Sequence, residues 1–190
     1  MRKTSVKLVG LCGIAGWILA AGYSAVAGQQ PSRAIGRGEY LVNGTGCGDC
    51  HTPMKMGPSG PVPDSARLLS GHPEKLDMPA PPKLGQGPWL GVVSATFTAW
   101  AGPWGTSFTA NLTPDRETGL GGWTAQTFVD AIRAGRHQGR GRQLLPPMPY
   151  IALRNLTDDD LRAIFAYLET IPPFANRVPD PVAPDLPGPR

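Results

Sequence analysis

Five consecutive residues carry the clearest chemistry in this sequence of 190 residues, Cys47-Gly48-Asp49-Cys50-His51. The spacing Cys-x-x-Cys-His is the attachment signal for a c-type haem. Each thiol can form a thioether with one vinyl group of the porphyrin, and the adjoining imidazole can bind the iron as an axial ligand. Gly48 supplies the backbone freedom that a tight turn between the two cysteines needs. The motif therefore predicts one covalently attached haem c, held by Cys47, Cys50 and His51.

Two other chemistries use a cysteine pair at this spacing. A thioredoxin-like redox disulfide needs a βαβ context, which the sequence upstream of Cys47 does not provide. A zinc site could combine both cysteines with His72 and His137, but structural zinc sites usually pair their ligands at short spacing, and these histidines lie far apart. Haem accounts better for the cysteine count, because the third cysteine, Cys12, falls in an apolar N-terminal segment.

The second axial ligand must come from elsewhere in the chain. Met54 and Met56 follow His51 too closely to reach the opposite face of a porphyrin. Met148 stands between Pro147 and Pro149, which stiffen its loop, and it precedes the last predicted helix, so we predict Met148 as the sulfur ligand. Thioether ligation raises the reduction potential relative to two histidines. The alternatives are that Met148 fills a gap in the core, and that the ligand is Met78, His72 or His137.

The N-terminus predicts export. Residues 1–27 combine three basic residues, an apolar run from Leu8 and a small-residue cleavage site, Ala25-Val26-Ala27. The alternative is a retained membrane anchor, because no charged residue occurs between Leu8 and Gln30 and that length can span a bilayer. Several glycines dilute the hydrophobicity of the run, which favours cleavage. The membrane is expected to involve this segment alone.

Composition predicts one globular domain with extensions. The chain is 41% hydrophobic and 17% charged, and its 25 Gly and 22 Pro indicate many turns and irregular loops. Loss of residues 1–27 would lower the formal net charge from +4 to +1, and no basic run marks a nucleic-acid partner. We expect a signal peptide or anchor at 1–27, a linker at 28–33, a haem domain at 34–173 and a proline-rich tail at 174–190.

Three helices are predicted around the motif. The first covers residues 33–42 with Ser32 as its N-cap, and it keeps two glycines, Gly36 and Gly38, as a helix does when another backbone approaches closely. A second helix begins after Thr124 and ends at Gly135. The last follows Thr157, has acidic residues in its first turn, and can turn Tyr167 toward the glycines of the first helix. Its apolar stripe consists of Leu161, Ile164, Phe165 and Leu168.

The segments between these helices are expected to be irregular. Nine prolines between Thr52 and Pro88 predict an ordered loop wrapped on the haem, with room for a short helical turn at residues 65–69. A backbone carbonyl of this loop is expected to accept the second ring N–H of His51. The stretch from Pro172 to Arg190 is predicted to be extended and poorly packed. Arg136, Arg140 and Arg142 form either a solvated loop or a site for the haem propionates.

Four segments together resemble class I c-type cytochromes, and more narrowly the haem domains in cytochrome subunits of bacterial membrane-associated dehydrogenases for alcohols, aldehydes and sugar acids. The resemblance spans about residues 36–179. Its matching segments are residues 47–52, 111–123, 147–150 and 160–173, which include Asn111-Leu112-Thr113-Pro114-Asp115, Gly122-Trp123 and Pro147-Met148-Pro149-Tyr150.

This resemblance implies a small, mostly α fold around one haem, with long Pro/Gly-rich loops and crossed first and last helices. It implies His51 and Met148 as axial ligands. Those subunits often carry three haem motifs and this sequence has one, so a relay of several haems within it is excluded. Thioether attachment in that family belongs to the periplasm or the outer face of the cytoplasmic membrane.

The expected function is single-electron transfer between a redox donor, such as a membrane-associated dehydrogenase, and a respiratory acceptor. The sequence shows no paired nucleophile and base, no phosphate loop and no second metal cluster, so an enzyme is not expected. The alternatives are a five-coordinate haem enzyme or sensor, if Met148 does not bind the iron, and a zinc-bound interaction module.

Overall fold

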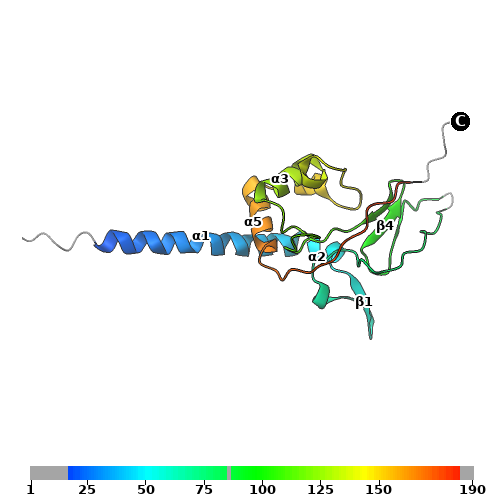
Figure 1. Ribbon diagram of the computed structural model, residues 1–190, viewed down its shortest axis with the longest axis horizontal. Helices are drawn as coiled ribbons and strands as arrows, with labels where there is room; N and C mark the ends of the chain where they lie inside the picture. Colours follow the sequence, from blue (N-terminus) through cyan, green and yellow to red (C-terminus); the bar gives the residue numbers. More distant parts are fainter. Residues whose placement is uncertain (1–16, 85–86, 185–190) are drawn as a thin grey trace, which may run out of the picture. The chain divides into compact units, whose positions relative to one another are not determined.

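The computed structural model describes residues 17–84 and 87–184 (Figure 1). The chain divides between Arg33 and Ala34 into two compact units. Most of the predicted export segment, with Cys12, lies outside the described residues. Within the described ranges, no helix combines the length and apolar character that crossing a membrane requires.

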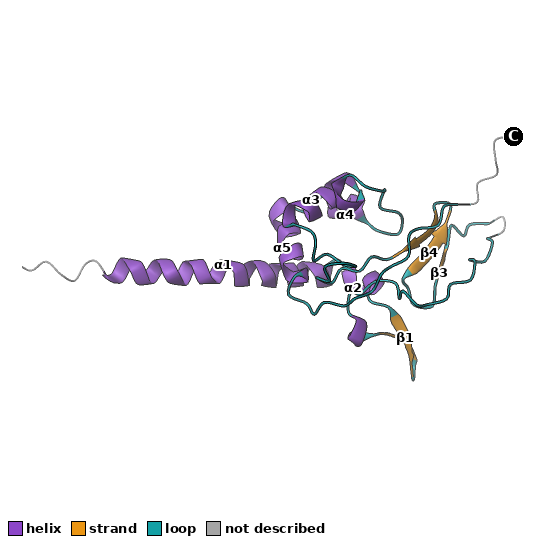
Figure 2. Cartoon of the chain, in the orientation of Figure 1, coloured by secondary structure: helices purple, strands orange, loops and turns teal. Residues whose placement is uncertain are grey.

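Helices make up most of the regular structure in the described residues (Figure 2), and the predicted mostly α fold class with long loops is confirmed. The helices are α1 (Trp17–Gly44), α2 (Cys47–His51), α3 (Ala125–Ala134), α4 (Tyr150–Leu153) and α5 (Asp158–Leu168), with 3-10 turns η1 (Ser65–Arg67) and η2 (His137–Gly139).

The predicted starts of α3 and α5 and the predicted end of α3 are correct, because the capping residues satisfy free backbone groups there. Thr124 accepts a hydrogen bond from the Thr127 N–H, and Thr157 accepts one from the Asp160 N–H. Gly135 adopts a left-handed conformation, φ 63°, at the end of α3. The predicted Ser32 cap is wrong, because α1 already begins at Trp17 and continues through Pro31.

Two small antiparallel sheets accompany the helices. One pairs β1 (Met54–Gly57) with β2 (Gly60–Pro63), and the other orders β3 (Val92–Val93), β4 (Ala99–Gly102) and β5 (Gly105–Phe108) as β3-β4-β5. The ordered loop predicted from Thr52 to Pro88 therefore contains a hairpin, β1–β2, that was not predicted. Pro61 and Pro63 are accommodated because both strands are edge strands, whose outward-facing positions need no N–H donor. The predicted helical turn is present as η1.

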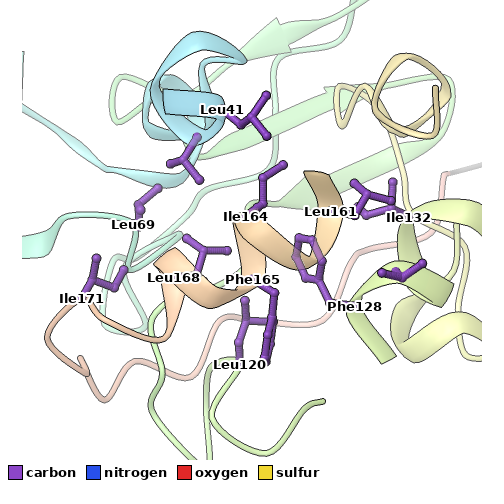
Figure 3. Close-up of a cluster of buried hydrophobic side chains, with 12 residues drawn as sticks. Leu41, Leu69, Leu120, Phe128, Ile132, Leu161, Ile164, Phe165, Leu168 and Ile171 are labelled. Atoms are coloured by element: carbon purple, nitrogen blue, oxygen red, sulfur yellow. The ribbon is translucent and has the colours of Figure 1, made fainter. Parts of the chain in front are cut away.

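The core forms around α5, whose apolar stripe is buried as predicted (Figure 3). Side chains from α1, from α3 and from the loops on either side converge on this stripe. The rings of Phe165 in α5 and Phe128 in α3 pack at a tilt, with centroids 5.7 Å apart. The buried cluster comprises Leu41, Val42, Leu69, Leu120, Phe128, Val129, Ile132, Leu161, Ile164, Phe165, Leu168 and Ile171.

The last part of α1 crosses α5 at Gly38. A methyl group added at Gly38 would collide with the backbone oxygen of Ala163 and lie 2.8 Å from Cβ of Tyr167. The same group added at Gly36 would meet no atom within 4 Å. Arg37 Nε donates to Asp160 at 2.8 Å beside the crossing. The predicted crossing is therefore present, and only one of the two glycines is needed for it.

Residues 172–184 are extended, but specific contacts hold them in place, so the prediction of poor packing is wrong for them; residues 185–190 lie outside the described residues. Asn176 is 1% exposed. Farther along, Val182 and Thr106 exchange two backbone hydrogen bonds of 2.9 Å, which fasten the segment to the edge of β5. The segment is held by polar and backbone contacts to distant residues, which leave no periodic apolar signal in the sequence.

Candidate functional site

A cavity of about 680 Å³ is lined by all four predicted site residues, Cys47, Cys50, His51 and Met148, and its lining extends past the predicted haem domain, residues 34–173, into the C-terminal segment. Its volume falls within the range of about 300–1,000 Å³ typical of ligand and cofactor sites. Most of its wall is apolar, which suits a large planar ligand with a hydrophobic body. The helices α3 and α5 contribute Phe128, Ala131, Ile132, Leu161, Ile164 and Leu168.

Helix α2 presents both thiols to the cavity. It begins after Gly46, whose left-handed backbone, φ 70°, turns the chain out of α1. Burial raises the pKa of both thiols, Cys47 and Cys50, and the neighbouring Asp49 carboxylate raises that of Cys50 further. Both side chains are therefore neutral thiols at neutral pH, the form in which they can each add across a vinyl group.

The two alternatives for this cysteine pair are not formed in the described part of the chain. Cys47 and Cys50 are free cysteines, so no disulfide joins them. Among residues 17–84 and 87–184, no group of three or more His, Cys, Asp or Glu side chains is arranged to hold a metal ion.

His51 is oriented by a backbone carbonyl. Its ring is buried, and Nδ1 lies 2.7 Å from the carbonyl oxygen of Ala110. Because a carbonyl only accepts, the proton of the neutral ring is on Nδ1, and the lone pair of Nε2 is free for a metal. Burial lowers the pKa of His51, so the ring is neutral at neutral pH. The acceptor was predicted between Thr52 and Pro88; that location is wrong, because Ala110 belongs to a later segment that returns beneath the ring.

Two paired segments hold Ala110 in place. His72 N–H donates to the Thr109 carbonyl at 2.9 Å, and Leu112 N–H donates to the Leu69 carbonyl at 2.9 Å, so residues 69–72 run antiparallel to residues 109–112. Gly71 lies at the centre of this pairing with φ 75°, and a methyl group there would come within 2.6 Å of the Ala110 carbonyl. Only glycine fits both the conformation and the close approach.

Met148 is held on the cavity wall by its loop. Its N–H donates to the Leu145 carbonyl at 3.2 Å, and Ser107 Oγ of β5 donates to the Pro146 carbonyl at 2.6 Å. The Tyr150 ring packs so closely on Gly135 that a side chain there would collide with it. Sequence reasoning identified Met148 but missed Ser107, because a lone serine on a strand carries no local signal of a loop about forty residues away.

The remaining candidates for the second axial ligand separate into two groups. His137 lines the cavity and meets the Trp123 ring edge-on, with centroids 5.1 Å apart. Met78 and His72 do not line it. His72 is fully buried, hydrogen bonded through Nδ1 to Thr98 at 2.9 Å and packed 4.8 Å from the Phe108 ring. These contacts give His72 a structural role away from the cavity.

Two arginines reach the cavity. Of the three predicted for the propionates, Arg142 lines it, Arg140 does not, and Arg136 donates instead to the Gly141 carbonyl at 3.0 Å. Arg177, on the C-terminal segment, also lines the cavity. Sequence reasoning missed Arg177 because it treated that segment as poorly packed. Both guanidinium groups can pair with carboxylates at the edge of a ligand.

Comparisons with known proteins identify relatives of this chain. No family model matches the chain. Over 89 residues it is 39% identical to a nicotinate dehydrogenase subunit of Pseudomonas putida, a match covering 47% of this chain and 7% of that protein. Over 167 residues it is 30% identical to the cytochrome c subunit of the quinone alcohol dehydrogenase of Gluconobacter oxydans, covering 86% of this chain and 27% of the relative. The cytochrome subunit of fructose dehydrogenase from Gluconobacter japonicus is 30% identical over 142 residues, which are 75% of this chain and 22% of that relative.

The chain thus spans less than a third of the length of each of these relatives. Two of the three are cytochrome subunits of dehydrogenases, and they match most of this chain. The resemblance stated from the sequence motifs is confirmed.

Proposed function

We propose that this chain, which resembles the cytochrome c subunits of bacterial alcohol and fructose dehydrogenases over most of its length, is a monohaem cytochrome c that carries single electrons. The single observation that carries the proposal is the convergence of Cys47, Cys50, His51 and Met148 on one apolar cavity. Their types and their common cavity fit one haem c. Haem bound there would supply a one-electron iron couple.

The chain's own residues would do three things for that couple. The thiols of Cys47 and Cys50 would tether the porphyrin covalently, so that it stays bound in both oxidation states. The neutral His51 ring, with its Nδ1–H on Ala110, would offer Nε2 as a nitrogen ligand of raised basicity. Met148 would offer a thioether, which favours the reduced iron and raises the potential.

The apolar lining of the cavity would suit electron transfer better than a reaction on a bound substrate. Ligation by both His51 and Met148 would leave no coordination position for a substrate, and the leucine and isoleucine side chains of α3 and α5 would keep water away from a group bound in the cavity. We propose that the donor is a dehydrogenase and the acceptor a respiratory component, because the relatives are named as dehydrogenase subunits. We further propose export before haem attachment, from the sequence of residues 1–27.

The test is the mass and visible spectrum of the protein expressed with a cytochrome c maturation system. The mass should exceed that of the chain by one haem and should survive acid denaturation. The reduced-minus-oxidised spectrum should be that of a six-coordinate c-type cytochrome. A bare-chain mass would contradict the proposal, and a five-coordinate spectrum would leave the haem but reassign Met148.

Variants of the motif provide the control. Cys47→Ser together with Cys50→Ser should abolish the covalent mass, because no thiol is left to form a thioether. Ser59→Ala, in the exposed turn between β1 and β2, should leave the covalent mass unchanged.

A further inference from the structure

We infer that Asn176, on the C-terminal segment, is a positioning residue for His51. This inference rests on the proposed ligation of haem by His51. Asn176 is separated from His51 by most of the chain, and it is not among the predicted site residues. It does not line the cavity.

The side-chain amide of Asn176 makes three hydrogen bonds inside the protein. Its side chain is 1% exposed. Nδ2 donates to the Ser70 carbonyl at 2.7 Å and to the His72 carbonyl at 2.8 Å. Oδ1 accepts from the Glu74 N–H at 2.9 Å. One planar amide therefore fixes three backbone groups of the segment 70–74, and a buried amide held in this way is costly to disturb.

The segment that Asn176 fixes, residues 70–74, also contacts His51. Ser70 and His72 lie on either side of Gly71, whose N–H donates to the backbone carbonyl of His51 at 2.8 Å. The other face of Gly71 lies against Ala110, the acceptor of the His51 ring proton. Asn176 thus fixes the position of the residue that contacts both the backbone and the ring acceptor of His51.

A second asparagine, Asn111, joins the C-terminal segment to residues 109–112, the other half of the pairing. Asn111, next to Ala110, is 4% exposed and donates through Nδ2 to the Phe174 carbonyl at 2.8 Å. Its Oδ1 accepts from the Thr113 N–H at 3.0 Å. The C-terminal segment is therefore attached to both paired segments next to His51, residues 69–72 and 109–112, and Asn176 makes three of the segment's hydrogen bonds.

The expected consequence is electronic as well as structural. A carbonyl held at 2.7 Å from Nδ1 draws on the ring proton and makes the imidazole a stronger donor to iron. A stronger donor stabilises the oxidised iron. If Asn176 is altered, Gly71 and Ala110 are less firmly fixed, the hydrogen bond to Nδ1 weakens, and the midpoint potential should rise.

The experiment uses the full haem-attached protein with the substitutions Asn176→Asp and Asn176→Ser. The first replaces the two N–H donors by an oxygen that faces the Ser70 and His72 carbonyls. The second is too short to reach them. Asn155→Asp is the matched control, because Asn155 is exposed and bonds only within its own turn through Ile151. Val129→Ala, buried in α3, controls for a general loss of stability.

Both Asn176 variants should raise the midpoint potential and shift the paramagnetically displaced ring-proton signals of His51. Val129→Ala should lower the denaturation midpoint while leaving the potential and those signals in place. If an Asn176 variant loses stability but keeps the wild-type potential, Asn176 is a structural residue and the inference is wrong. Absence of covalent haem from the wild-type protein would instead refute the proposed function.

A measurement on the wild-type protein covers the case in which neither variant accumulates. The Gly71 N–H and the Asn176 side-chain N–H groups should exchange with deuterium at least about ten-fold more slowly than the Asn155 side chain, since their exchange needs an opening of the buried pairing. Equal exchange rates would show that the hydrogen bonds between Asn176 and residues 70–74 are not formed, and the inference would be wrong.

Discussion

The two walls of the cavity that carry the proposed ligands, His51 and Met148, are held by different means. On the histidine wall, His51 is buried and both its ring and its backbone are hydrogen bonded to a pairing of distant segments. On the methionine wall, Met148 is only half-buried and sits on a loop stiffened by prolines. That loop is joined to the rest of the fold through the Ser107 hydrogen bond and the packing of Tyr150.

Because the two walls are held differently, we expect the proposed ligands His51 and Met148 to leave the iron under different conditions. The histidine wall depends on contacts between residues far apart in the chain, so it should persist until the domain unfolds. The methionine wall depends on a local loop, and local openings cost less free energy than global unfolding. We therefore expect Met148 to be displaced first, whether by a competing ligand or by denaturant.

The largest effect is expected from Met148→Ala in the haem-attached protein. Loss of the thioether should lower the midpoint potential by about 0.1 V or more, a fraction of the ~0.8 V that axial ligands span. The weak red band of the oxidised, methionine-bound form should vanish. The measurement is a spectroscopic redox titration, with Met78→Ala as the control. If Met148→Ala changes neither property, His137 becomes the candidate, because it shares the cavity wall.

Acid should destabilise the histidine wall through His72, which belongs to the segment pairing next to His51. Burial lowers the pKa of His72 to about 4. The unfolded chain binds a proton near pH 6.5 and the folded chain does not, so stability is complete above about pH 6.5 and falls toward pH 4. The loss attributable to His72 is at most about 3 kcal/mol. Guanidinium unfolding at pH 7 and pH 4.5 measures it, and His72→Gln should flatten the difference. An equally steep fall in that variant would assign the effect to other groups.

The helix crossing supports both walls and should not distinguish them. Gly38→Ala should lower the free energy of unfolding by roughly 1–3 kcal/mol, because the methyl group collides with α5. Gly36→Ala, in open space on the same helix, should instead stabilise by up to about 1 kcal/mol. Denaturant unfolding followed at the Soret band measures both. Stabilisation by both substitutions would show that the crossing is looser than the structure has it.

The smallest effect is expected from Ser107→Ala, which removes the hydrogen bond to the Pro146 carbonyl. Such a bond contributes about 0.5–1.5 kcal/mol. Imidazole should then displace Met148 at a several-fold lower concentration, since ~1 kcal/mol corresponds to about five-fold in an equilibrium constant. The midpoint potential before imidazole is added should not change. An unaltered imidazole affinity would mean that the prolines alone hold the loop.

Features set by short stretches of chain could be predicted from the sequence. The thiols and imidazole of residues 47–51 are within one turn of each other, so their shared chemistry follows from covalent spacing. The caps Thr124 and Thr157 act on N–H groups three residues away, and the stripe of α5 follows from its helical period. Met148 could be selected because adjacent prolines restrict its backbone.

Features that depend on pairing between distant segments were decided only by the tertiary structure. Nothing near His51 indicates that Ala110 accepts its proton, and nothing near Asn176 indicates that it clamps Ser70 and His72. Gly36 and Gly38 look alike in the sequence, yet one meets α5 and the other meets open space. The physical reason is that a hydrogen bond or a close contact depends on where two backbones meet in space. Loops rich in proline and glycine carry no periodic pattern that fixes that meeting point in advance.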